Sequence, residues 1–157
     1  MKNWLLITGV IGAAGLFIWH NFKDKFVANA SEYLKENFSI QVAGVKIHKV
    51  GLTGLELRIN ADLINLSPIQ VIVDNLKAYV FYVNNGKNNH LATTTINNKF
   101  TIASKDTSRI SDIKISVPYA SILQNMGLLN AVNRQFKIVV SANVNGTNLQ
   151  FSNNITA

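Results

Sequence analysis

The sequence of 157 residues contains no cysteine, so neither a disulfide nor a metal site built on thiolates can form. Only 15% of its residues are charged, and acidic residues are scarcer than basic ones, 8 against 15. Its three histidines, His20, His48 and His90, stand apart, with no His-Glu-x-x-His motif and no spacing typical of metal ligands. There is also no glycine-rich phosphate loop after a strand. We therefore predict a non-enzymatic protein that needs neither cofactor nor metal.

Charge is also missing from the whole segment Trp4–Trp19, which would form a helix of about 24 Å. Lys2 and Lys23 stand just outside it, and the two tryptophans fall where aromatic belts meet a bilayer. A cleaved secretion signal and a buried soluble helix are the two alternatives. We predict a retained single-pass anchor over residues 1–21, with membrane-contacting side chains Trp4, Leu5, Leu6, Ile7, Val10, Ile11, Leu16, Phe17, Ile18 and Trp19.

Small residues gather within this predicted anchor. Thr8 and Gly12, like Gly9 and Ala13, have the four-residue spacing that lets two membrane helices approach closely. The alternative is that glycine and alanine are simply common in membrane helices. The predicted helix-packing residues are Thr8, Gly9, Gly12, Ala13 and Gly15.

Residues 22–37 continue with helical periodicity and without glycine or proline. Phe22, Phe26, Ala30, Tyr33 and Leu34 share one narrow face, and charged residues occupy the remainder. We predict an amphipathic helical stalk whose apolar face docks on the following domain or on a partner, rather than lying in the membrane interface.

From Phe38 onward the apolar period changes from 3.6 to 2, which is typical of half-buried strands. Residues 55–63 alternate cleanly, Ala43-Gly44 indicates a bulge, and residues 70–83 predict a central strand covered on both faces. A helix over 119–132 is predicted to turn Ile122, Leu123, Met126 and Leu129 toward the core. The last hairpin, FKIVVSANVNGTNLQF, turns at Asn145-Gly146. Residues 38–157 are thus predicted to form a mostly β domain, an antiparallel β-sandwich of seven or eight strands with one short helix.

The order of these features resembles the late-embryogenesis-abundant type 2 family, also called the WHy domain. The elements that carry the resemblance are ADLINLSPIQV, LKAYVFYVNNGKNNHLAT, DIKISVP, ASILQNMG and the closing hairpin, over residues 40–151. In that family an asparagine and a proline are adjacent, whereas Leu66-Ser67 separates Asn65 from Pro68 here. The resemblance implies a non-catalytic, fibronectin-like sandwich that is often membrane-tethered and serves protection or interaction.

Positive charge is concentrated on the predicted sandwich, where eleven basic residues face five acidic ones. Such an excess favours solubility or attraction to an anionic surface, but no basic stripe or motif specific for nucleic acid is present. We expect a membrane protein whose partners are the lipid bilayer and other proteins of an assembly, a second copy included. A bacterial envelope complex or the internal membrane of a virus particle would suit. The alternative is a lipid- or apolar-ligand-binding or stress-protective module.

Overall fold

The computed structural model describes residues 31–157. The chain forms two compact units, with the boundary after Glu36. Residues 31–37 are helical, and the remainder of the predicted stalk lies outside the described residues. No helix among residues 31–157 is long and apolar enough to cross a membrane.

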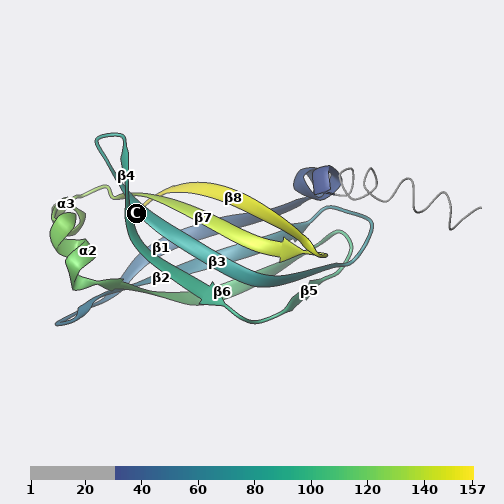
Figure 1. Ribbon diagram of the computed structural model, residues 1–157, viewed down its shortest axis with the longest axis horizontal. Coiled ribbons are helices and arrows are strands. Elements are labelled where there is room, and N and C mark those ends of the chain that lie inside the picture. Colours follow the sequence, from purple (N-terminus) through teal and green to yellow (C-terminus); the bar gives the residue numbers. More distant parts are fainter. Residues whose placement is uncertain (1–30) are drawn as a thin grey trace, which may run out of the picture. The chain divides into compact units, whose positions relative to one another are not determined.

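Residues 37–157 form two antiparallel sheets, as the alternation predicts. The first sheet has the order β1-β2-β6, and the second has the order β4-β3-β7-β8 with a short β5 also paired to β3 (Figure 1). The strands are β1 (Phe38–Gly51), β2 (Gly54–Asn65), β3 (Val71–Asn84), β4 (Lys87–Ile96), β5 (Phe100–Ile102), β6 (Asp106–Pro118), β7 (Gln135–Val144) and β8 (Thr147–Thr156). Two short helices, α2 (Tyr119–Gln124) and α3 (Gly127–Asn130), connect β6 to β7.

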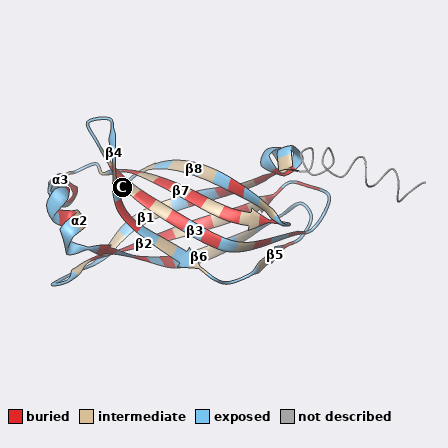
Figure 2. Cartoon of the chain, viewed as in Figure 1, coloured by how far each residue is buried: buried red, intermediate tan, exposed pale blue. Residues whose placement is uncertain are grey.

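The core lies between the two sheets, where buried residues alternate with exposed ones along the strands (Figure 2). In β2 and β7 the sequence pattern predicts the inward set correctly; these residues are Leu55, Leu57, Ile59, Ala61 and Leu63 in β2 and Phe136, Ile138, Val140, Ala142 and Val144 in β7. Alternation is a reliable signal here because each strand has one face buried and one face toward solvent. The predicted bulge is also present, as a register shift between Val42 and Gly44.

The prediction that residues 70–83 are covered on both faces is wrong in part. β3 is central in its sheet, but Ile72 on its outer face is exposed, and Tyr79 and Phe81 are only partly buried. A register shift between Asp74 and Lys77, with Asn75 at a φ of 51°, moves the buried set from Val71 and Val73 to Leu76 and beyond. Apolar residues at odd and at even positions of β3 therefore lie on the same face, because a bulge changes the phase of the strand.

The connection from β2 to β3 is organised by Asn65, which is completely buried. Its Nδ2 group donates hydrogen bonds to the carbonyl oxygens of Ile69, Ile102 and Ala103, at 2.8, 3.3 and 2.9 Å. Its Oδ1 atom accepts from both the backbone N–H and the hydroxyl of Ser67. One amide thus holds together a turn, the end of β5 and the residue before Pro68.

Candidate functional site

The residues predicted to contact the membrane and to pack helices, from Trp4 to Trp19, lie outside the described residues, and so does His20. The structure therefore bears on the sandwich and leaves the anchor as a prediction.

Within residues 31–157 no cluster of three or more histidine or carboxylate side chains is placed to hold a metal ion. His48 and His90 are both exposed and lie on different sheets. The His90 ring packs edge-on against Phe81, and its Nε2 atom lies 2.9 Å from the hydroxyl of Thr93. These contacts are those of a histidine on a sheet surface.

The outer face of the first sheet carries a small ion-pair network. Glu56 on β2 pairs with Arg58 at 2.6 Å and with Lys114 of the neighbouring strand β6 at 3.0 Å. The hydrogen bond from Lys114 is the largest cause that holds the pKa of Glu56 below its usual value; desolvation opposes it, and the hydrogen bond from Arg58 adds to the lowering. Farther along the same face, Arg109 binds Asp62 through two hydrogen bonds of 2.7 and 2.8 Å and lowers the pKa of that carboxyl. Exposed pairs of this kind contribute little to stability.

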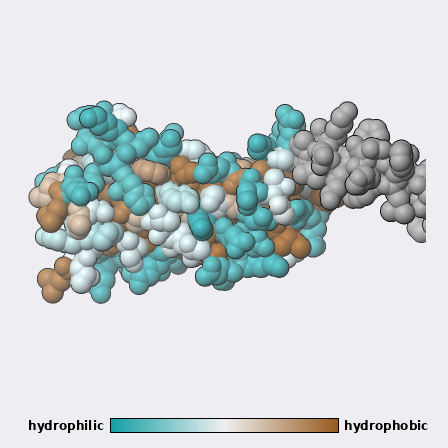
Figure 3. Space-filling view, viewed as in Figure 1, coloured by the Kyte–Doolittle hydropathy of each residue, from teal (hydrophilic) through white to brown (hydrophobic). Residues whose placement is uncertain are grey.

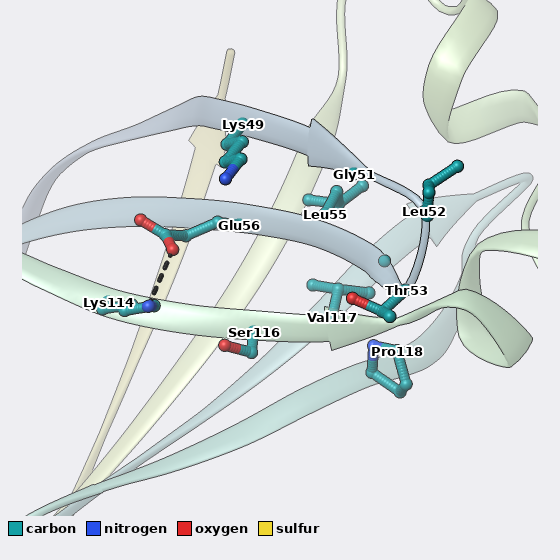
Figure 4. A pocket seen from close by; sticks show the side chains of 11 residues that line it. Lys49, Gly51, Leu52, Thr53, Leu55, Glu56, Lys114, Ser116, Val117 and Pro118 are labelled. Carbon is teal, nitrogen blue, oxygen red and sulfur yellow. Dashed lines mark ion pairs between the residues drawn. The ribbon is translucent and has the colours of Figure 1, made fainter.

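Beside Glu56 lies an open groove of about 660 Å³, formed by the β1–β2 turn and the adjoining ends of β2 and β6. Lys49 of β1 and Lys114 of β6 lie on either side of Glu56, and Leu52 and Thr53 close the end of the groove (Figure 4). The groove opens outward from the sheet rather than between the two sheets, so it is not an internal site for an apolar ligand.

The same end of the sandwich exposes large apolar side chains on two neighbouring features, the β1–β2 turn and the α2–α3 connection (Figure 1). We call this surface the apolar tip; its residues are Val50, Leu52, Tyr119, Leu123, Met126 and Val132. Leu52 is 100% exposed and Val132 is 91% exposed. Brown side chains are visible over both features in the space-filling view (Figure 3).

Local sequence explains why these side chains face outward. Pro118 ends β6, and the next residue, Tyr119, donates its backbone N–H to the carbonyl of Thr53 in the β1–β2 turn at 3.2 Å. The connection then forms two helices of six and four residues, which bury Ile122 and Leu128 respectively.

The prediction that Leu123, Met126 and Leu129 face the core is therefore wrong, because all three are exposed. A single continuous helix would have placed them with Ile122 on one face. Instead α2 ends at Gln124, and the side-chain amide of the next residue, Asn125, donates to the carbonyl of Ser121 at 2.8 Å. The break rotates the second helix so that Leu128 takes the inward position.

Charge around the apolar tip is mainly positive, with Glu56 as the carboxylate that borders it, paired with Lys114 at 3.0 Å. Residues 115–133 contain no charged side chain at all, and Lys114 and Arg134 stand at the two ends of this run. The other tip segment, residues 46–55, contains Lys46 and Lys49 and no carboxylate. Sequence reasoning missed the tip, although a run of 19 uncharged residues outside the predicted anchor was a visible signal.

No protein-family model matches the chain, and no curated protein matches it by sequence. Two solved structures share its fold at low sequence identity. A protein from Archaeoglobus fulgidus aligns with a TM-score of 0.51 and 10% identity, over 74% of this chain and 94% of its own. A protein from Arabidopsis thaliana, solved in solution, aligns with a TM-score of 0.52 and 14% identity, over 75% of this chain and 76% of its own.

A third solution structure is described as a candidate late embryogenesis abundant (LEA) protein. It aligns with a TM-score of 0.48 and 14% identity, over 99% of this chain and 86% of its own. The domain formed by residues 37–157 is a β-sandwich, and the first two of these structures share its fold.

Proposed function

We propose that this chain is a non-catalytic, membrane-anchored structural or interaction protein that holds a β-sandwich at a bilayer within a larger assembly. The observation that carries the proposal is the uncharged segment Trp4–Trp19, flanked by Lys2 and Lys23, ahead of a sandwich with its own core. A bacterial envelope complex or a membrane-containing virus particle is the kind of assembly that such a protein would serve.

The chemistry of the described residues supports a binding role over a catalytic one. Glu56 and Asp62 have lowered pKa values because they are paired with cations on a solvated sheet face. A carboxylate that acts as a general acid or base needs a pKa near the working pH. Burial raises the pKa of a carboxylate toward that range, whereas pairing with a cation lowers it.

The second candidate is a lipid-binding or stress-protective module of the late-embryogenesis-abundant type 2 kind. The observation that favours it is the exposed apolar tip, together with the resemblance in strand order and the net positive charge of the sandwich. An apolar ligand held between the sheets has less support, because facing core residues such as Leu57, Leu63 and Val80 are completely buried.

The anchor is tested by replacing Gly12 and Leu16 with arginine in the full-length chain. Each arginine at mid-bilayer costs roughly 2.5–3.5 kcal/mol on insertion scales, so the variant should leave the membrane fraction. The measurement is the fraction that stays with membranes after an alkaline carbonate wash. A control variant with Thr101→Arg and Ser104→Arg adds the same charge to exposed positions of the sandwich and should stay bound. Retention of the Gly12, Leu16 variant would contradict the proposal.

A further inference from the structure

We propose that the apolar tip of the sandwich is a contact site for an anionic lipid bilayer. The inference goes beyond the membrane-anchored function and deepens the second candidate, on which it rests, because it concerns residues 46–55 and 114–134 and does not use the predicted anchor. It adds a second membrane contact that belongs to the folded domain itself.

The shape of the tip favours lipid over a protein partner. Leu52 projects from the tight turn between β1 and β2, where the chain reverses between Gly51 and Gly54, and it is completely exposed. Val132 is exposed almost as fully on the connection to β7. A protein partner would need a preformed pocket for each projecting side chain. A bilayer interface accepts such side chains without a complementary surface.

The basic residues around the tip favour an anionic membrane over a neutral one. The uncharged run of residues 115–133 can approach acyl chains without burying a charge, which would be costly there. Lys49, Lys114 and Arg134 border the tip; Glu56 pairs with Lys114, and no carboxylate occurs within either tip segment. Basic groups at a membrane surface attract anionic headgroups. The same charge disfavours a second copy bound tip to tip, because the two basic borders would repel.

The opposite end of the sandwich provides an internal comparison. Leu66 and Ile69 are also exposed there, at 55% and 53%. That end carries carboxylates as well, since Asp106 lies opposite Asn65 in the sheet and Asp62 lies opposite Arg109. Exposed apolar side chains therefore occur at both ends, but at the tip basic groups outnumber the one bordering carboxylate, Glu56.

Several backbone polar groups at the tip have partners within the domain, as an apolar environment requires. Arg134 donates from Nε to the carbonyl of Leu128 at 2.6 Å and from a terminal nitrogen to that of Leu129 at 3.2 Å. The Tyr119 N–H is bound to the Thr53 carbonyl. The tip can thus enter the interface as a preformed surface.

The experiment uses the absence of cysteine, since Leu52→Cys in the full-length chain gives a single labelling site for an environment-sensitive fluorophore. Full-length protein in neutral phosphatidylcholine vesicles is mixed with a second set of vesicles, of phosphatidylcholine alone or with phosphatidylserine. We expect emission at position 52 to shift to shorter wavelength, and to be quenched by spin-labelled acyl chains, only with phosphatidylserine. The same label at Ser104→Cys, in the exposed loop before β6, should not respond.

Substitutions at the tip test whether apolar contacts and positive charge bind it to the membrane. Leu52→Asp with Leu123→Asp should weaken capture of fluorescent anionic vesicles by tenfold or more, because two apolar contacts with the membrane are lost. The matched control, Leu66→Asp with Ile69→Asp, changes side chains of similar exposure at the other end and should leave capture unchanged. Lys49→Glu should weaken capture by roughly tenfold or more and reduce its dependence on salt.

Three results would overturn the proposal: no response at position 52, equal responses at positions 52 and 104, or a response at position 52 that rises with protein concentration without lipid. The last would show that the tip binds protein instead. The test is separate from that of the anchor. If residues 1–21 do not insert, the labelled protein is added from solution, and position 52 still reports the same contact.

Discussion

Asn153, on β8, closes the seam between the two sheets by binding the backbone of β1 around Val42. Its Oδ1 atom accepts the Val42 N–H at 3.1 Å, and its Nδ2 group donates to the carbonyl of Ile40 at 3.2 Å. The side-chain amide therefore takes the place of a neighbouring strand for one residue pair. Strands β1 and β8 lie at the edges of different sheets, where backbone groups would otherwise lack partners.

Replacing Asn153 with alanine should lower the free energy of unfolding by about 1–2 kcal/mol, because two partly buried hydrogen bonds are lost. Replacement with aspartate should cost at least as much, since a carboxylate cannot donate to the Ile40 carbonyl. Urea unfolding, followed by circular dichroism, measures both. Asn154→Ala on the next, exposed position is the control and should change stability by less than about 0.5 kcal/mol. Equal effects at positions 153 and 154 would show that the seam does not depend on this amide.

Asn65 should be the polar residue whose loss is most damaging in the β2–β3 connection. Alanine at this position would remove the acceptor of the buried Ser67 N–H and the amide donor of three carbonyl oxygens, of which that of Ile69 keeps the Ser67 hydroxyl, at a cost of about 2–4 kcal/mol. The same unfolding measurement tests this, with Asn98→Ala in the exposed loop before β5 as the control. A loss below about 1 kcal/mol would mean that water replaces the amide, which its complete burial argues against.

The fold could be predicted from the sequence where apolar and polar residues alternate along a strand that buries one face. In β2 and β7 each inward residue has a polar neighbour, and Asn145-Gly146 gives the hairpin its two left-handed residues, with φ values of 48° and 84°. Glu56 and Arg58, two positions apart on the outer face of β2, form an ion pair at 2.6 Å. Lys114, the third member, is 56 positions beyond Arg58 in the sequence, so only the register of β2 with β6 brings it there.

The apolar tip could not be predicted in the same way, because a prediction from periodicity places apolar residues in the core. In helices of six and four residues only one side chain each reaches the core, and the remaining apolar residues have no inward face to occupy. The double role of Asn65, in a turn and at the end of β5, likewise depends on contacts over nearly forty positions. Such contacts follow from the sheet topology rather than from any local pattern.

Acid should destabilise the sandwich by a small amount through its two paired carboxylates, because exposed ion pairs contribute little. The folded-state pKa values of Glu56 and Asp62 are below the ordinary values of 4.5 and 3.8, so the unfolded chain binds protons more readily. Their contribution is present above pH 4.5 and is lost as the pH falls through the lowered pKa values. Thermal melts of the wild type should show a melting temperature that falls on acidification in this range.

The variant Glu56→Gln with Asp62→Asn should show a shallower fall, because both groups that titrate have been removed. Asp112→Asn is the control, since its carboxyl belongs to neither ion pair, and its profile should follow the wild type. A double variant with the full wild-type slope would assign the acid sensitivity to other groups.

Glycine is required at position 54 but not at position 44, although both lie in the strands of the first sheet. A Cβ atom at position 54 would lie 2.1 Å from the carbonyl oxygen of Val117, across the pairing of β2 with β6, and φ there is 155°. A Cβ atom at position 44 would meet nothing within 4 Å. Gly54→Ala must therefore push β6 away from the turn that carries Leu52, and it should cost about 2–4 kcal/mol, whereas Gly44→Ala should cost less than about 1 kcal/mol. Urea unfolding of the two variants side by side measures the difference, and equal stabilities would mean that β2 and β6 are not held this closely at the tip.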